Sequence, residues 1–158
     1  MRREIDQIIE TMQQVMDGQP WFGRPLFSLL NEVHPAEVFK KPNDEGHSLI
    51  ELVYHMITWT EFTLHRVEGR NEPDLAEMES QDWRVIDPLV HTWSKGLETL
   101  RSEHDEIIRI LHQKDDSFLD QPVEYRDYNF RFLLNGIIQH DIYHLGQIAY
   151  LTKWLIPA

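Results

Sequence analysis

Two histidine residues four positions apart, His140 and His144, lie in the apolar stripe of a helix predicted near the end of the sequence. An α-helix completes a turn about every 3.6 residues, so positions i and i+4 share a face. The apolar residues of that face are Leu133, Ile137, Ile148 and Leu151. Both imidazoles therefore point toward the core, where polar groups need partners. One divalent metal ion would bind both rings.

A third histidine occupies a similar place on another predicted helix. His55 shares one helical face with Leu52, Trp59 and Phe62. Three histidines that converge in the core of a helical bundle would form a metal-ligand set with an open coordination position. The alternative is a set of core histidines whose nitrogens are satisfied by hydrogen bonds.

The composition predicts one globular domain that spans residues 1–158. Of the 158 residues, 41% are hydrophobic and 27% are charged, which is enough apolar material for one sizeable core. The 27 acidic and 15 basic residues give a formal net charge of −12. A surface of this sign repels nucleic-acid backbones and anionic lipids. We therefore expect no nucleic-acid partner and no membrane association.

Cysteine is absent from the sequence, which excludes disulfides, thiolate ligands and a cysteine nucleophile. The N-terminal stretch is charged from its second residue and lacks the apolar segment of a signal peptide. No apolar run approaches the length of a membrane span. These features predict a soluble, cytoplasmic protein.

Hydrophobic residues recur with helical periodicity along most of the chain, and no alternation of strands and helices is evident. The pattern predicts helical segments over residues 3–17, 26–30, 48–67, 81–113 and 129–155. Ser48 and Glu51 have the spacing of a capping box, in which each side chain accepts a hydrogen bond from the other residue's backbone N–H. Four long amphipathic segments with connections of modest length predict an all-α fold, an antiparallel four-helix bundle.

Two stretches around the histidines, Gly46–Trp59 and His140–Ile148, resemble the DinB/YfiT-like superfamily, and so does Gln19–Gly23. The resemblance covers nearly the whole chain. It implies a four-helix bundle that often forms homodimers. It also implies a divalent metal bound by one histidine of the second long helix and by an H-x₃-H pair of the fourth.

Three residues match these ligand positions one for one, namely His55, His140 and His144. Imidazole ligands suit several transition metals. We expect zinc or nickel, with iron, manganese and cobalt as alternatives. Three neutral imidazoles leave the charge of a divalent ion unbalanced, which favours an anionic ligand such as hydroxide, thiolate or carboxylate in the open position.

The resemblance leaves two activities open, because some members are transferases that use low-molecular-weight thiols and others are described as metal-dependent hydrolases. A metal ion would supply a thiolate nucleophile in the first case and an activated water in the second. The leading prediction is a thiol-dependent S-transferase that acts on small electrophiles. The alternatives are a hydrolase and a non-catalytic dimeric bundle with a structural metal. A carboxylate-bridged di-iron site requires Glu-x-x-His pairs, and the sequence contains none.

Three further residues near the histidines are candidates for supporting roles. Glu51 lies one turn before His55 and could act as a general base, although capping already explains its position. Asp141 could orient a metal ligand through a hydrogen bond or lie on the helix surface. Gln147 could hold a bound water, orient a substrate or make an interhelical hydrogen bond. The other histidines are expected at the surface or partly buried: His34, His47, His65, His91, His104 and His112.

Overall fold

A computed structural model describes residues 1–70 and 75–155 of the chain. Within these residues the regular structure is helical, apart from one isolated antiparallel bridge between Pro122 and Asn129. The helices are α1 (Arg3–Met16), α2 (Leu26–Leu30), α3 (Leu49–Val67), α4 (Leu75–Ser80), α5 (Trp93–Leu111), the 3₁₀ helix η1 (Asp116–Asp120) and α6 (Phe130–Leu155). The predicted all-α fold is confirmed.

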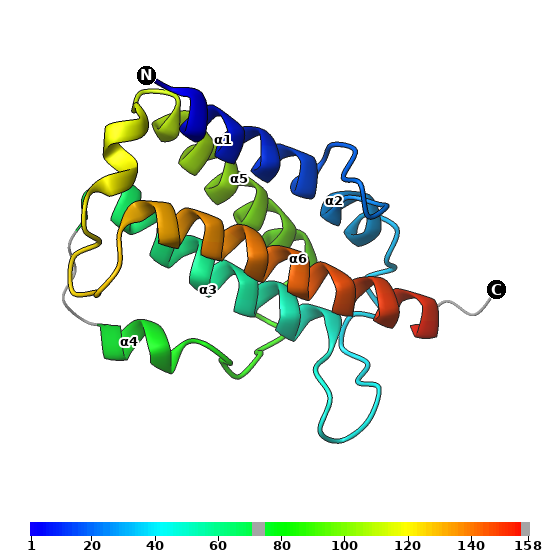
Figure 1. The fold of residues 1–158 in the computed structure, drawn as a ribbon. Coiled ribbons are helices and arrows are strands. Elements are labelled where there is room, and N and C mark those ends of the chain that lie inside the picture. Colours follow the sequence, from blue (N-terminus) through cyan, green and yellow to red (C-terminus); the bar gives the residue numbers. More distant parts are fainter. Residues whose placement is uncertain (71–74, 156–158) are drawn as a thin grey trace.

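The four long helices α1, α3, α5 and α6 lie side by side and form a bundle (Figure 1). Helices α1 and α6 run in one direction, and α3 and α5 run in the opposite direction. The contacts agree, because Tyr54 near the start of α3 donates a hydrogen bond to the carbonyl of Thr92, which directly precedes α5. Since α3 and α5 are parallel, the chain between them must return along the bundle. Its described parts, residues 68–70 and 75–92, are called the crossover below.

The crossover explains why one predicted helix boundary is wrong. The pattern predicts a helix over residues 81–113, but α5 begins at Trp93, and residues 81–92 form turns and irregular structure. The side chain of Thr92 accepts a hydrogen bond from the backbone N–H of Lys95 and caps the helix at this later point.

Most apolar residues of the misassigned stretch are not buried in the core, although Ile86 is partly buried and packs against it. Val85 and Leu89 are each 91% exposed, and Trp83 lies flat against a histidine ring of α3. Their spacing imitates a helical stripe over a short distance. Pro88 is the contrary signal, because proline lacks the N–H that a helix interior needs. The short helix α4, which lies earlier in the crossover, was not predicted.

The ends of α3 have the expected chemistry. The Ser48 hydroxyl accepts a hydrogen bond from the backbone N–H of Glu51, and the Glu51 carboxylate accepts one from the backbone N–H of Ser48 at 2.8 Å. This confirms the predicted capping box. At the other end Gly69 has a φ of 75°, a conformation that favours glycine and ends the helix.

Helix α3 is at the centre of the core and packs most extensively on α5 and then on α6. Helix α5 comes close to the side chains of α3 at Gly96. A Cβ atom at that position would lie 3.1 Å from the ring of Tyr54 and 3.2 Å from the side chain of Val53. A larger residue would push the two helices apart, because a packed core has little free space.

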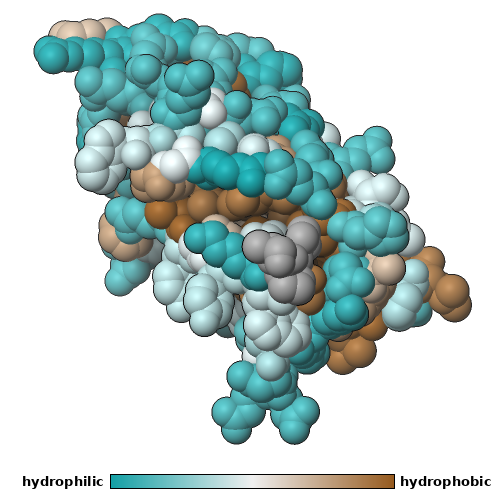
Figure 2. Space-filling model, turned by 90° about the vertical axis from the view of Figure 1, so that its right-hand side faces the viewer, coloured by the Kyte–Doolittle hydropathy of each residue, from teal (hydrophilic) through white to brown (hydrophobic). Residues whose placement is uncertain are grey.

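The face seen in Figure 2 is mostly hydrophilic, with a recessed strip of hydrophobic residues across the middle and smaller hydrophobic groups at its edges. A hydrophilic exterior agrees with the formal net charge of −12. Among the residues that the structure describes, no helix is both long enough and apolar enough to cross a membrane.

The carboxyl group of Glu103, on α5, is partly buried, and hydrogen bonds in the described part of the chain do not fully replace its contacts with water. The Oε2 atom of Glu103 is buried and has no hydrogen-bond partner in the described part of the chain. Burial, and then the nearby carboxylate of Glu61 on α3, raise the pKa of Glu103 to about 8, against the opposing charges of His104 and Arg84. Glu103 is therefore largely protonated at neutral pH.

This protonation predicts a pH-dependent effect of Glu103→Gln. Folding raises the pKa of Glu103 from 4.5 to about 8. The contribution of the protonated group to the free energy of unfolding is therefore fully present below pH 4.5 and is lost as the pH rises from there through about 8. We expect the substitution to leave the free energy of unfolding nearly unchanged at pH 4. At pH 9 it should raise that free energy by about 1–2 kcal/mol, after a discount for partial exposure to solvent. Urea unfolding at both pH values measures the difference, and an equal effect at the two values would contradict the assignment.

Candidate metal centre

Helices α3 and α6 bring three imidazoles together at one point in the core. The Nε2 atom of His140 lies 3.0 Å from Nε2 of His55 and 3.1 Å from Nε2 of His144. The i,i+4 spacing places His140 and His144 on one face of α6, and α3 presents His55 opposite them. One nitrogen from each ring lies within 4.8 Å of the others, so a single metal ion could contact all three. The structure thus brings the three predicted ligands together.

Two of the rings are oriented by hydrogen bonds on their outer side. Nδ1 of His55 lies 3.0 Å from the backbone carbonyl of Asp82 and 2.9 Å from Oδ1 of the same residue. Nδ1 of His144 lies 2.6 Å from Oε1 of Gln147. Because these oxygens are acceptors, each Nδ1 carries the proton and donates it, and each Nε2 directs a lone pair toward the common point.

Hydrogen bonds within the protein cannot pair every ring nitrogen of the three histidines. Nε2 of His140 carries at most one proton and can donate it well to only one of the two neighbouring Nε2 atoms. The other Nε2 then keeps an unpaired lone pair in the core, and Nδ1 of His140 is buried without a partner in the described residues. A cation at the common point would take a lone pair from each ring. The donor set therefore fits a divalent ion that prefers imidazole nitrogen.

The environment of all three imidazoles favours their neutral form. Burial, and then the neighbouring rings of His144 and His55, lower the pKa of His140 to about 3. Burial also lowers the pKa of His55 despite the opposing effect of Asp82, and it lowers the pKa of His144 despite the hydrogen bond to Gln147. The neutral ring is the form that binds a metal ion.

The crossover supplies contacts to His55 that sequence reasoning missed. Oδ1 of Asp82 accepts a second hydrogen bond, from Nε1 of Trp59, at 2.5 Å. The indole of Trp83 stacks on the His55 ring with centroids 3.9 Å apart and also stacks on His47 at 3.7 Å. His55 is thus held at its edge by a carboxylate and at its face by an indole. Asp82 and Trp83 were missed because the pattern assigned them to a helix.

A second polar pair is fully buried between α5 and α6. Nε2 of His104 lies 2.9 Å from Oδ2 of Asp141, and Nδ1 of His104 donates a hydrogen bond to the carbonyl of Leu100. The two side chains are 2% and 1% exposed, so the expectations of a surface or partly buried histidine and a surface carboxylate are wrong. Burial disfavours the charged ring, but the charge and hydrogen bond of Asp141 outweigh it and raise the pKa of His104. The contact with Asp141 therefore favours the protonated, charged form of His104, and Asp141 makes no hydrogen bond to the three converging rings.

The remaining two candidates have simpler roles. The Glu51 carboxylate accepts hydrogen bonds from Ser48 and forms an ion pair with Lys41 at 2.8 Å, so it caps α3. Gln147 bonds to His144 within its own helix, so the expected interhelical hydrogen bond is not the one that forms.

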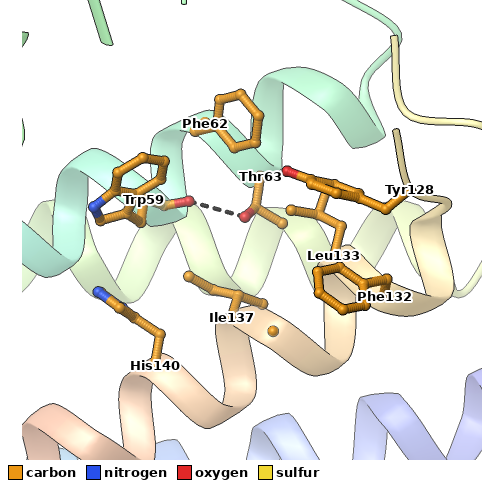
Figure 3. A pocket seen from close by; sticks show the side chains of 9 residues that line it. Trp59, Phe62, Thr63, Tyr128, Phe132, Leu133, Ile137 and His140 are labelled. Carbon is orange, nitrogen blue, oxygen red and sulfur yellow. Dashed lines mark hydrogen bonds between the residues drawn. The ribbon is translucent and has the colours of Figure 1, made fainter. Parts of the chain in front are cut away.

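An apolar pocket lies beside His140, between α3 and α6 (Figure 3). Its cavity volume is about 180 Å³. The residues that line it are Trp59, Phe62, Thr63, Tyr128, Phe132, Leu133, Gly136, Ile137 and His140. A second depression, of about 510 Å³, lies beside Gln147 and is lined by both polar and apolar groups, including His47, Tyr143 and Gly146. We call these two spaces the apolar pocket and the second depression.

The fold and the histidine cluster together define a helical-bundle protein with a potential trihistidine metal centre. The sequence pattern of the DinB superfamily matches residues 24–148, which is most of the chain and includes all three histidines. The chain therefore belongs to the DinB superfamily. A comparison with curated proteins found no match.

The buried ion pair predicts strongly coupled effects on stability. His104→Leu should lower the free energy of unfolding by about 3–5 kcal/mol, because it leaves the Asp141 carboxylate buried and unpaired. The double substitution His104→Leu/Asp141→Leu removes both charges and should recover most of that loss. Urea unfolding of the metal-free variants completes the double-mutant cycle. Independent, additive losses would contradict the pairing.

Proposed function

We propose that the protein is a metal-dependent enzyme that transfers small thiols to electrophilic substrates, with one divalent ion held by His55, His140 and His144. The observation that carries the proposal is the convergence of three neutral imidazoles whose Nε2 atoms cannot all be paired by the protein itself. A divalent ion held there would lower the pKa of a bound thiol, so that the sulfur is a thiolate at neutral pH.

The state of the nearby carboxylates supports thiol transfer over hydrolysis. A hydrolase gains more from a base, because water is a weaker acid than a thiol even when a metal ion lowers its pKa. Asp82 is bonded to His55 and Trp59, and the Asp141 carboxylate is paired with His104. Glu51 is engaged at the start of α3. A thiol of lowered pKa loses its proton to solvent and needs no such base.

The sulfur must come from a separate molecule, because the chain contains no cysteine. In the transfer, the sulfur forms a bond to the electrophilic carbon while the leaving group departs with the bonding electron pair. The thiol proton has already passed to solvent.

The protein's own groups would orient the centre and balance its charge. Asp82 and Gln147 keep Nε2 of His55 and His144 directed at one point. The negative charges of Asp141 and Asp82 both reach His144, where they favour positive charge. They would therefore offset part of the charge of a bound cation.

Metal binding should depend on the histidines of α6. We expect about one divalent ion per chain, and His140→Ala or His144→Ala should remove most of it, because two imidazoles in this core cannot hold the ion as tightly as three. His112→Ala, at an exposed position, is the matched control. Elemental analysis of the purified variants measures the content, and full retention by both α6 variants would overturn the site.

Acid should release the metal without unfolding the bundle. Protons compete with the ion for the imidazoles, whose ordinary pKa is about 6.5. Burial lowers the pKa of all three rings here. Because these pKa values are lowered, release is expected well below the ordinary imidazole pKa, at about pH 5 or lower. Chelation at neutral pH should leave the helical circular-dichroism signal in place, because the apolar stripes supply most of the stability. Collapse of that signal would instead favour a structural metal.

Thiol transfer is tested directly with the cobalt-loaded protein. Titration with small cellular thiols should produce a sulfur-to-metal charge-transfer absorption, and an electrophilic test substrate should be conjugated in parallel. His140→Ala serves as the metal-site control and should show neither signal. Metal-dependent cleavage of esters or amides without any charge-transfer band would replace the transferase with a hydrolase.

A further inference from the structure

We propose that the apolar pocket between α3 and α6 binds a single aromatic ring, or an apolar group of similar size, belonging to the electrophilic substrate. The inference rests on the proposed function, because it names the class of substrate that the centre would act on. Its basis is the lining, the volume and the position of the pocket, each of which is independent of the metal.

The lining of the pocket disfavours a charged group on the ligand. Aromatic and aliphatic side chains of α3 and α6 form nearly all of the wall, with Trp59 and Phe62 on one side and Leu133 and Ile137 on the other (Figure 3). The hydroxyl of Thr63 already donates its proton to the carbonyl of Trp59 at 2.8 Å. Transfer of a charge from water into such a space is costly, whereas an aromatic ring gains from leaving water.

The volume limits the ligand to one ring. The pocket holds about 180 Å³. An engineered apolar cavity of about 150 Å³ binds benzene. Pockets for drug-sized molecules are larger, at about 300–1,000 Å³. A monocyclic ring with one small substituent therefore fits, and a fused bicyclic system does not.

The position of the pocket directs the ring toward the centre. His140 and Trp59 are at one end, and Tyr128 and Phe132 are at the other (Figure 3). His140 is also the residue whose Nε2 lies within about 3 Å of both other imidazoles, at 3.0 and 3.1 Å. A ring held between the two ends would place an attached electrophilic carbon next to the centre. Such positioning makes attack by a bound thiolate effectively intramolecular.

Two glycines on α6 provide a matched pair of variants. Gly136 lines the apolar pocket, and Gly146 lines the second depression. A Cβ atom at either position would have no neighbouring atom within 4 Å, so neither substitution creates a backbone clash. Replacement of glycine within a helix also favours the helical state. Gly136→Leu should fill the apolar pocket, and Gly146→Leu should leave it open.

The probe is 4-fluorotoluene, and its binding is followed by ¹⁹F NMR with metal-free and metal-loaded protein. We expect binding to the natural chain and to Gly146→Leu with dissociation constants within about threefold, and at least tenfold weaker binding to Gly136→Leu. The charged analogue 4-fluorobenzoate should bind at least tenfold more weakly than 4-fluorotoluene. Leu133→Ala enlarges the pocket and should improve the relative binding of 1-fluoronaphthalene. Equal binding to both leucine variants, or loss only in Gly146→Leu, would overturn the proposal.

Failure of the pocket and failure of the proposed function can be distinguished. The ring should bind to metal-free protein, because protein side chains alone form the pocket. Ring binding that Gly136→Leu abolishes, in a protein that shows no charge-transfer band, would retain the pocket and reject the thiol transferase. Metal and thiol binding without ring binding would retain the thiol transferase and reject the pocket. A change in oligomeric state in Gly136→Leu, with ring binding unchanged, would assign the groove to a second copy of the chain and overturn the proposal.

Discussion

Three uncharged imidazoles share one point inside the bundle, and the surrounding structure keeps them neutral and correctly turned. Burial holds the pKa of His140 at about 3 and lowers the pKa of the other two rings. Two hydrogen-bond acceptors then fix the tautomers of His55 and His144. Asp82 of the crossover accepts from His55, and Gln147 of α6 itself accepts from His144. The geometry of the centre therefore depends on two hydrogen bonds that lie outside it, an arrangement common among histidines that bind metals.

The direction of the helices explains how an acceptor reaches His55. Helices α3 and α5 run the same way, so the chain between them passes along the bundle instead of turning at one end. The crossover is anchored to α3 by polar contacts. Arg84 donates a hydrogen bond to Oγ1 of Thr58 at 2.6 Å, and the Thr58 hydroxyl donates one to the carbonyl of Gln81 at 3.0 Å. These contacts bracket Asp82 in sequence and hold it against the ring.

Long continuous apolar stripes made α1, α3 and α6 predictable to within one or two residues, and the i,i+4 pair in such a stripe made the centre predictable. Residues 81–92 were not, because a few exposed apolar residues satisfy a helical period by chance. The roles of His104 and Asp141 were also hidden. These residues are 37 positions apart and meet only because the tertiary fold brings one side chain of α5 and one of α6 together in the core. Local patterns report which face a residue occupies, but the partner across an interface depends on the tertiary fold.

The three rings lie on helices and two of their contacts lie in the crossover, and this bears on how the sequence of such a site can change in evolution. The three rings lie on helices whose packing tolerates little change, whereas Asp82 and Trp83 lie in a connection, and connections accept substitution and insertion more readily. Replacement of the carboxylate by a weaker acceptor would alter the electron donation of His55 without repacking the core. With a metal ion held as proposed, its identity and reactivity would therefore respond to substitutions in the crossover while the bundle stays constant, so that one histidine pattern can serve more than one chemistry.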